Sequence, residues 1–236
     1  MLPITESTFE TACFGGPVWR YTYEGSSDPA EVAVVAKSRS VKLVMCRIPA
    51  DADKAAPAAL ERAGFRLIER LVTFERPLDR APEVRRTVEA ARGEDRQACV
   101  EIAIAALRQD RFHADRLIDP RIADALKAEW VNNNLMGRAE LNLVARDNLG
   151  RVAGFNQLLR TGREAAIDLI AVAPWAQQQG YGKALVAAGL HAFASKADTM
   201  RVGTQGANEA SLALYRSTGF MIIHQQLTYH LSATSL

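Results

Sequence analysis

A glycine-containing loop between a strand-like and a helix-like segment constrains this chain most. Residues 165–173 are apolar apart from Asp168, Pro174 stops that run, and Gly180 and Gly182 then open a stretch of helical periodicity. Glycine lets the main chain adopt angles that other residues resist and lets a ligand approach the backbone. Free amides at the start of a helix, with the helix dipole behind them, bind anions. The loop therefore predicts a phosphate-binding site, to which Lys183 adds a positive charge.

Two common phosphate-binding signatures do not fit this loop. It is neither the G-x-x-x-x-G-K-[ST] of P-loop proteins nor the G-x-G-x-x-G of dinucleotide-binding folds. Strand-like and helix-like segments nevertheless alternate after residue 86, which indicates an α/β or α+β protein. The predicted strands are residues 87–90, 141–146, 151–159, 165–173, 200–204 and 220–231, the last as one strand or two. The predicted helices are residues 94–107, 120–132, about 181–194 and 209–218.

A short pattern occurs twice and divides the chain. Leu60–Phe65 aligns with Tyr215–Phe220, and nine residues past each glycine stands a threonine. Either this common unit of helix, glycine, phenylalanine and strand recurs by chance, or the first copy is a half-domain without a site. The run 75–86, rich in proline and charge, predicts a linker. We expect a degenerate domain over residues 1–80 and a catalytic domain over residues 84–236. In the first domain the predicted elements are strands at 31–36 and 42–47 and a helix at 56–63.

Composition limits the partners and the compartment. The chain of 236 residues is 48% hydrophobic and 24% charged, as in ordinary globular proteins. A net charge of +2 gives no electrostatic reason to expect a nucleic-acid or membrane partner. Three scattered cysteines and four histidines without ligand spacing predict neither disulfides nor a metal site. Without a leader or a long apolar run, we expect a cytoplasmic protein with a small-molecule partner, and a homodimer is one open expectation.

The glycine loop resembles the acetyl-coenzyme A signature of the GNAT superfamily of N-acetyltransferases. Val172–Pro174 and Gln177–Gly182 fit the family pattern of a strand, V-x-P and [Q/R]-x-x-G-x-[G/A] opening a helix. The resemblance implies a GNAT fold, which has a mixed, mostly antiparallel central sheet flanked by helices, here preceded by a truncated GNAT-like half. It also implies acetyl-coenzyme A as cosubstrate and no metal. Amides of residues 178–183 would hold the pyrophosphate, and the strand end at 169–172 would pair with the pantetheine arm.

Carried over residue by residue, the cofactor-binding residues are Leu169, Ile170, Ala171, Val172, Gln177, Gln178, Gln179, Gly180, Tyr181, Gly182, Lys183 and Asn208. One departure matters, because Gln177 stands where the family often has arginine. Phosphate binding is therefore expected from the amides and Lys183 more than from a guanidinium.

A second motif follows downstream. Asn208–Phe220 resembles the family pattern N-x-x-A, then Y-x-x-x-G-F, and Asn208 is a plausible helix N-cap in its own right. Tyr215 lies two turns along the same helix face. The resemblance implies that Asn208 contacts coenzyme A and that Tyr215 protonates the leaving thiolate. A phenol with a pKa of about 10 suits that task.

The resemblance extends to one branch, the dTDP-fucosamine (dTDP-4-amino-4,6-dideoxygalactose) N-acetyltransferases of bacterial surface-polysaccharide synthesis. It rests on Phe14–Gly15 with Arg20, on Asp110–Asp115 and on Arg201–Gln205. It implies a nucleotide-linked amino sugar as acceptor, with Arg111 and His113 as substrate-binding residues. Asp110 and Leu214 depart from the branch pattern, where serine and arginine are usual. Both departures lie where an acceptor would bind.

Asp168 is the candidate for a catalytic base, because it lies on the donor strand with the side-chain parity of Ile170. The alternative is an ordinary solvated carboxylate. The function predicted is acetyl transfer to the primary amine of a small acceptor, with Tyr215 as general acid. The alternatives are an acetyltransferase for another amine (an amino acid, a polyamine, a drug or a protein N-terminus) and an acyl-coenzyme A-binding module without catalysis.

Overall fold

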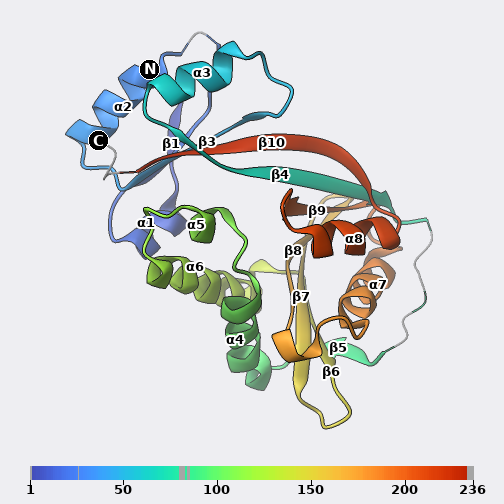
Figure 1. The fold of residues 1–236 in the computed structure, drawn as a ribbon. Coiled ribbons are helices and arrows are strands. Elements are labelled where there is room, and N and C mark those ends of the chain that lie inside the picture. The colour runs from blue at the N-terminus through green and yellow to red at the C-terminus, as the bar shows by residue number, and fades with distance from the viewer. Residues whose placement is uncertain (1, 26, 80–82, 84–85, 233–236) are drawn as a thin grey trace.

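In the computed structural model, a single mixed sheet of ten strands runs through the protein (Figure 1). The structure describes residues 2–25, 27–79, 83 and 86–232. The strand order is β1-β2-β3-β10-β4-β9-β8-β7-β6-β5. Among these neighbours only β2–β3 and β8–β9 are parallel. The strands are β1 (Ile4–Glu6), β2 (Val18–Tyr21), β3 (Leu43–Pro49), β4 (Arg66–Pro77), β5 (Val88–Ala90), β6 (Leu141–Arg146), β7 (Val152–Thr161), β8 (Glu164–Val172), β9 (Thr199–Gln205) and β10 (Met221–Ser232).

Helices cover both faces of this sheet. The helix α7 packs on β6, β7 and β8 from one side, while α4 packs on β7 and β8 from the other and also contacts α6 (Figure 1). The α-helices are α1 (Thr8–Phe14), α2 (Pro29–Ser38), α3 (Ala55–Arg62), α4 (Arg96–Ala106), α5 (Arg111–Ala114), α6 (Pro120–Asn133), α7 (Tyr181–Phe193) and α8 (Glu209–Ser217). Short helical turns are η1 (Gly93–Asp95), η2 (Asn134–Arg138, of π type) and η3 (Pro174–Ala176).

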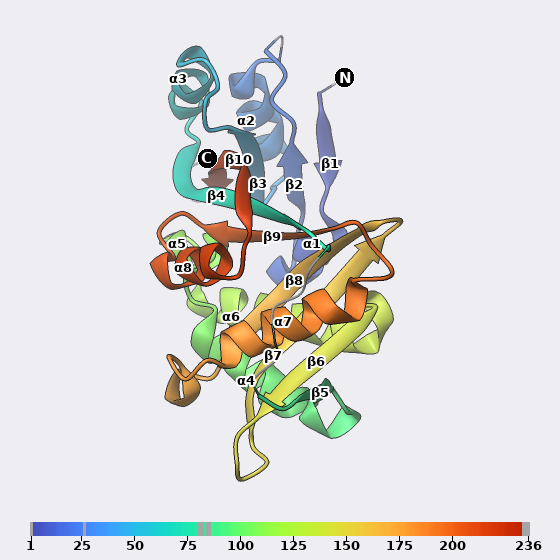
Figure 2. The ribbon, with the colours of Figure 1, turned by 90° about the vertical axis from the view of Figure 1, so that its right-hand side faces the viewer.

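The last strand of the chain lies inside the sheet and not at its end. β10 pairs with β3 on one side and with β4 on the other, so the C-terminal strand stands between two strands of the N-terminal region. In turn, β4 pairs with β9 of the C-terminal region. Figures 1 and 2 show these two long strands side by side, at the junction between the upper and lower parts of the molecule. The two halves expected from the sequence therefore share one sheet.

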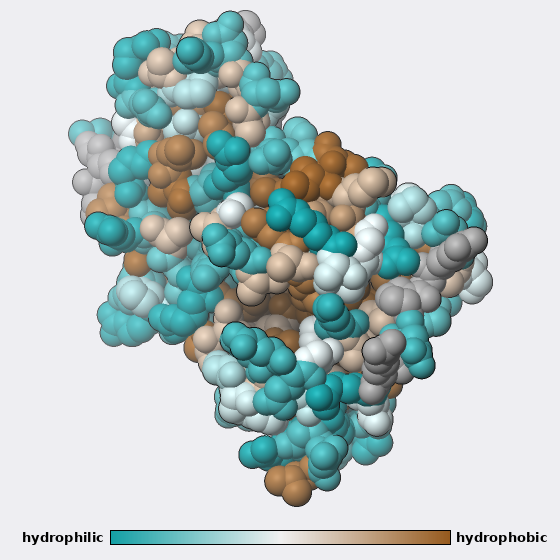
Figure 3. All heavy atoms as spheres, turned by 45° about the vertical axis from the view of Figure 1, so that its right-hand side comes forward, coloured by the Kyte–Doolittle hydropathy of each residue, from teal (hydrophilic) through white to brown (hydrophobic). Residues whose placement is uncertain are grey.

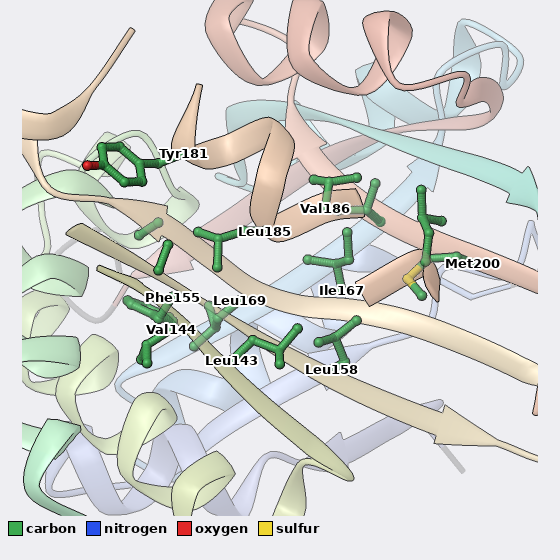
Figure 4. Close-up of a cluster of buried hydrophobic side chains, with 14 of the residues drawn as sticks. Leu143, Val144, Phe155, Leu158, Ile167, Leu169, Tyr181, Leu185, Val186 and Met200 are labelled. Atoms are coloured by element: carbon green, nitrogen blue, oxygen red, sulfur yellow. The ribbon is translucent and has the colours of Figure 1, made fainter. Parts of the chain in front are cut away.

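The largest apolar core joins α7 to the sheet beneath it. Figure 4 shows Leu185 and Val186 of α7 above Phe155, Ile167 and Leu169 of β7 and β8. Alternate residues along β8 are buried, and helices lie against both faces of the strand. Because burial of a leucine or phenylalanine stabilises a fold by about 1.5–3 kcal/mol, this core fixes the position of α7 on the sheet.

The predicted elements after residue 86 are all present, with ends shifted by a few residues, and 220–231 is one strand with irregular register. One earlier prediction is wrong. Residues 31–36, expected as a strand, lie in α2, because Asp28 caps this helix by accepting from the amide of Ala30 and Pro29 occupies its first turn. The predicted linker 75–86 begins later than expected, since β4 continues to Pro77. Residues 80–82 and 84–85 of it lie outside the described residues.

Among the helices that the structure describes, none is both long enough and apolar enough to pass through a bilayer.

Candidate active site

The two parallel strands β8 and β9 separate halfway along their length. Their pairing runs from Glu164 opposite Thr199 to Ile167 opposite Val202 and then stops. On its other edge β8 stays paired with β7 as far as Val172. The β9-facing backbone groups of residues 169–172 thus have no strand partner among the described residues. These are the residues predicted to pair with the pantetheine arm, and the separation leaves their backbone available to do so.

A β-bulge lies where the strands separate. Leu169 is paired with Gln157 and Ile167 with Leu158, so Asp168 has no partner on β7. Its Oδ2 accepts hydrogen bonds from Trp130 Nε1 at 2.7 Å, Asn134 Nδ2 at 2.8 Å and Arg138 Nη1 at 2.5 Å. The bulge, which strand parity does not anticipate, directs the carboxylate at α6 and η2. With three donors on one oxygen, Asp168 anchors these side chains, and its role as a base stays a prediction.

The glycine loop has the backbone of an anion site. Gln178 and Gly180 have φ angles of 60° and 86°, which turn the chain into α7. Within the described residues, the amides of residues 178–183 donate no hydrogen bond to a backbone carbonyl, and the first bond of the helix comes from Ala184 to Gly180. Six consecutive free amides with the helix dipole behind them suit a pyrophosphate.

The start of α7 packs closely against α8. A Cβ added to Gly182 would lie 3.3 Å from Leu214 Cδ2 and 3.8 Å from Val172 Cγ2, so a larger residue would push the loop away. This contact places the loop, the end of β8 and α8 side by side. The face that carries α7 and α8 is hollowed near its middle, and hydrophobic residues line the hollow (Figure 3).

Tyr215 and Asn208 both lie on α8. Asn208 Oδ1 accepts from the amide of Ser211 at 3.1 Å, which confirms the predicted N-cap. Tyr215 is 2% exposed, and its ring packs 5.6 Å from that of Phe74 and 5.7 Å from that of Phe220. Burial raises the pKa of the Tyr215 hydroxyl, and so keeps the phenol protonated. Its hydroxyl forms no hydrogen bond to any described residue, and its role as general acid stays a prediction.

A cavity of about 480 Å³ lies between the two halves of the protein. Its N-terminal wall is residues 5–10 with Arg20, and its C-terminal wall is Arg111, Trp130, Asn133 and Arg138. Trp130 and Arg138 also bind Asp168, so the cavity adjoins the bulge of the donor strand.

Charged side chains converge on one carboxylate in this cavity. Glu10 Oε1 lies 3.2 Å from Arg20 Nη2 and 3.2 Å from Arg111 Nη2. Burial alone would raise the pKa of Glu10, but the hydrogen bond from Ser7 and the two arginines outweigh it and hold that pKa below its usual value. Glu10 therefore stays ionised and keeps both guanidinium groups at the cavity wall.

The two predicted substrate-binding residues have different surroundings. Arg111 lines the cavity. His113 does not, since its Nδ1 lies 2.5 Å from Asp110 Oδ2 and its Nε2 lies 2.9 Å from Asp124 Oδ1. With both ring nitrogens engaged, His113 ties α5 to α6 in this structure.

Sequence reasoning did not single out several of the residues that meet here. Glu10, Trp130 and Arg138 reach the cavity from separate elements, and no local pattern marks them. Glu69, which does not line the cavity, has a side chain 5% exposed and an Oε2 without a hydrogen-bond partner among the described residues. Burial raises the pKa of Glu69 despite the neighbouring Arg111 and Arg47. Among the described residues, no group of three or more histidine, cysteine or acidic side chains could hold a metal ion.

A model of the acetyltransferase (GNAT) family matches residues 102–220, just over half of the chain. This span holds the separated end of β8, the glycine loop and Tyr215. The chain therefore belongs to the acetyltransferase (GNAT) family, and the members of that family use acetyl-coenzyme A.

Curated relatives match part of the chain. It is 32% identical over 138 residues to the spore coat polysaccharide biosynthesis protein SpsD of Bacillus subtilis (strain 168), a match that covers 58% of this chain and 47% of the relative. It is 35% identical over 104 residues to the mycothiol acetyltransferase of Clavibacter michiganensis subsp. michiganensis (strain NCPPB 382), covering 44% of this chain and 31% of that one. The chain thus spans less than half the length of these curated relatives.

Solved structures resemble nearly the whole chain. A GCN5-related N-acetyltransferase from Sphaerobacter thermophilus superposes with a TM-score of 0.64 at 14% identity, over 98% of this chain and 75% of that one. A tandem GNAT protein from the clavulanic acid biosynthesis pathway superposes with a TM-score of 0.61 at 15% identity, over 93% of this chain and 76% of that one. These likenesses confirm the predicted fold, a mixed and mostly antiparallel sheet flanked by helices.

Proposed function

We propose that this protein transfers an acetyl group from acetyl-coenzyme A to the primary amine of a small acceptor bound in the cavity between its halves. The observation that carries the proposal is the separation of β8 from β9 beside six free amides at the start of α7. The separated strands suit an extended thioester arm, and the amides suit the pyrophosphate at its other end.

Transfer would be direct. The amine nitrogen attacks the thioester carbon, a backbone amide of residues 169–172 stabilises the oxyanion, and the C–S bond then breaks. The thiolate takes its proton from the Tyr215 hydroxyl, and the proton released by the amine passes to water or to a nearby carboxylate. Solvent then returns a proton to the Tyr215 phenolate, which restores the enzyme. Buried Tyr215, with its raised pKa, is a protonated donor at neutral pH.

The three cysteine thiols are poorly suited to form a covalent acetyl-enzyme, which favours direct transfer. Cys13 is half-buried, and burial raises the pKa of its thiol. Cys46 and Cys99 are buried, and burial raises the pKa of each thiol to about 12. A thiol needs to ionise before it acts as a nucleophile, so none of these side chains is suited to attack the thioester.

For the acceptor, we propose a nucleotide-linked amino sugar. The charged and aromatic wall of Arg20, Arg111 and Trp130 suits a polar ligand that carries a phosphate. The relative SpsD is named for spore coat polysaccharide biosynthesis, which is consistent with a sugar acceptor. Another amine acceptor and an acyl-coenzyme A-binding module without catalysis remain the alternative functions.

The first experiment mixes the purified protein, acetyl-coenzyme A and a dTDP-4-amino-4,6-dideoxyhexose and detects the product by mass spectrometry. We expect an acetylated sugar amine that is absent with Tyr215→Phe. Acetyl-coenzyme A binding without transfer to the sugar or to a panel of amino acids, polyamines and peptides would contradict the enzymatic proposal. Transfer to another amine in that panel would instead overturn the sugar assignment alone.

A further inference from the structure

Arg86 lies against the glycine loop, although it is far from that loop in sequence. Its guanidinium carbon is 4.2 Å from the centroid of the Tyr181 ring. Its Nε is 3.8 Å from the point where a Cβ on Gly180 would stand. Arg86 precedes β5 by two residues, so it belongs to the segment that joins the two halves of the chain. The segment thus brings a cation to the free amides that begin α7.

The charge of Arg86 has no counter-ion among the described residues. Its side chain is exposed, and its one described interaction is the stacking on Tyr181. Stacking on an aromatic face occupies the plane of a guanidinium and leaves its N–H edge free to donate. The geometry is that of a side chain held in place by a ring, with its hydrogen-bonding edge unused.

A second arginine beside the same loop differs from Arg86 because it has a counter-ion. Arg151 stacks on Trp175 with its guanidinium carbon 4.3 Å from the ring, which is nearly the same distance. Its Nη2, however, forms an ion pair with Asp147 Oδ2 at 2.7 Å. The loop therefore has two stacked arginines, of which one is already neutralised by a carboxylate.

The glycine loop itself provides no guanidinium group to a bound phosphate. Gln177 stands where the family often has an arginine, and its side-chain amide donates to the carbonyl of Val172 at 3.3 Å. Gln179 likewise donates to the carbonyl of Trp175 at 3.0 Å. Both glutamines brace the loop and provide no positive charge to a ligand. A phosphate bound by the amides of 178–183 would meet Lys183 as the one cation from within the loop.

We propose that Arg86 binds a phosphate group of the acyl donor and supplies, from the segment between the halves, the guanidinium that the glycine loop itself lacks. The inference rests on the proposed function, in which that donor is acetyl-coenzyme A. The phosphate is either the pyrophosphate or the 3′-phosphate of the donor, because both carry the same chemistry. Arg86 is a binding residue in this scheme and takes no part in bond making.

The test measures binding without turnover. Coenzyme A, dephospho-coenzyme A and pantetheine are titrated into the wild type, Arg86→Ala, Arg86→Lys and Arg151→Ala by calorimetry. We expect Arg86→Ala to weaken coenzyme A binding about tenfold and to leave pantetheine binding unchanged. Arg86→Lys should recover part of the loss, since it keeps the charge without the planar fork. Arg151→Ala should stay within about twofold of the wild type, because its charge is already paired.

The three ligands show which phosphate Arg86 contacts. They also distinguish a failure of this inference from a failure of the proposed function. A tenfold loss with coenzyme A and with dephospho-coenzyme A supports contact with the pyrophosphate, whereas a loss with coenzyme A alone supports contact with the 3′-phosphate. Equal binding by the wild type and Arg86→Ala would overturn the role of Arg86 while the proposed function stands. A wild type that binds none of the three ligands would overturn the proposed function, and the inference with it.

Discussion

The two helix–glycine–strand units of this protein, α3 to β4 and α8 to β10, have the same backbone and different chemistry. Gly64 and Gly219 have φ angles of 89° and 84°. The amide of Phe65 donates to Leu60 and that of Phe220 donates to Tyr215, each at 3.0 Å. The repeated sequence pattern thus corresponds to a repeated helix ending.

The side chain at the matched position differs in kind and in surroundings. Leu60 is fully buried in the apolar core of the N-terminal half. Tyr215 is buried between the rings of Phe74 and Phe220, on a helix whose Leu214 contacts the start of α7. The first half has no counterpart of the glycine loop that precedes α7. A local pattern can therefore set the shape of a unit, but its function depends on which elements surround it.

The largest effect is expected from removing the hydroxyl of the second unit. Tyr215→Phe should lower kcat about 100-fold or more, because a general acid typically contributes that much, while binding of acetyl-coenzyme A and the melting temperature change little. The matched change is Leu60→Met in the first unit, which conserves volume and should leave kcat unaltered. Steady-state kinetics and calorimetric binding test both, and wild-type kcat in Tyr215→Phe would refute the role.

A large loss of stability is expected where the strands of the two units are held together. Asp115 Oδ1 accepts from Arg66 Nη2 of β4 at 2.6 Å, and its Oδ2 lies 3.0 Å from His230 Nδ1 of β10. Because removing one partner of a buried pair costs about 3–5 kcal/mol, Asp115→Asn should lower the free energy of unfolding by roughly 3 kcal/mol at pH 7. Urea denaturation measures this. Asp119→Asn, which keeps an exposed helix cap, is the control and should change stability by less than about 0.5 kcal/mol.

The same carboxylate predicts a pH dependence. Burial raises the pKa of Asp115, but hydrogen bonds from His230 and Arg66 outweigh it and hold that pKa below its usual value. A lowered folded pKa contributes stability above the unfolded pKa of about 3.9, and that contribution is lost as pH falls toward the folded value. The difference between the wild type and Asp115→Asn should therefore shrink below about pH 4. A difference that stays constant from pH 7 to pH 3 would count against this assignment.

A smaller effect is expected at the cavity, to which the two halves of the protein contribute different charged residues. Arg111→Lys removes the planar fork that binds Glu10 and lines the cavity proposed for the acceptor. We expect the KM for the acceptor to rise about tenfold, which corresponds to about 1.4 kcal/mol, with the KM for acetyl-coenzyme A unaltered. Initial-rate kinetics with each substrate varied in turn test this. Arg121→Lys, at an exposed site away from the cavity, provides the baseline, and an equal rise in both KM values would argue for a general structural defect.

A loss of stability of similar size should be alike in the two units. Gly64→Ala and Gly219→Ala each force a side chain into the left-handed region, which costs about 1–2 kcal/mol. The added Cβ would lie 3.4 Å from Leu231 Cδ1 in the first case and 3.2 Å from Arg76 Nη1 in the second. Urea denaturation should give similar losses for both, with Gly93→Ala, whose Cβ would meet nothing, as a control. A loss in one unit without the other would show that the two helix endings are not equivalent.

Local signals in the sequence determined most elements of the C-terminal half. Pro174, Gly180 and Asn208 mark boundaries through their own backbone preferences, and the structure has a turn or a helix end at each. The prediction for residues 31–36 was wrong because its valines favour a strand whereas its alanines favour a helix, and the cap at Asp28 settles the choice. The resemblance of the glycine loop and of Asn208–Phe220 to family motifs also indicated the family.

Only the tertiary structure decided which strands pair and which side chains meet. The position of β10 between β3 and β4, the bulge at Asp168 and the separation of β8 from β9 depend on pairings between distant segments, which no local pattern specifies. Glu10 and Arg111 stand 101 residues apart in sequence and form an ion pair across one cavity. Propensity acts over a few residues, whereas charges and cavities depend on distances in space. The sequence by itself therefore determined the secondary-structure elements, and the tertiary structure decided which of their side chains meet in the site.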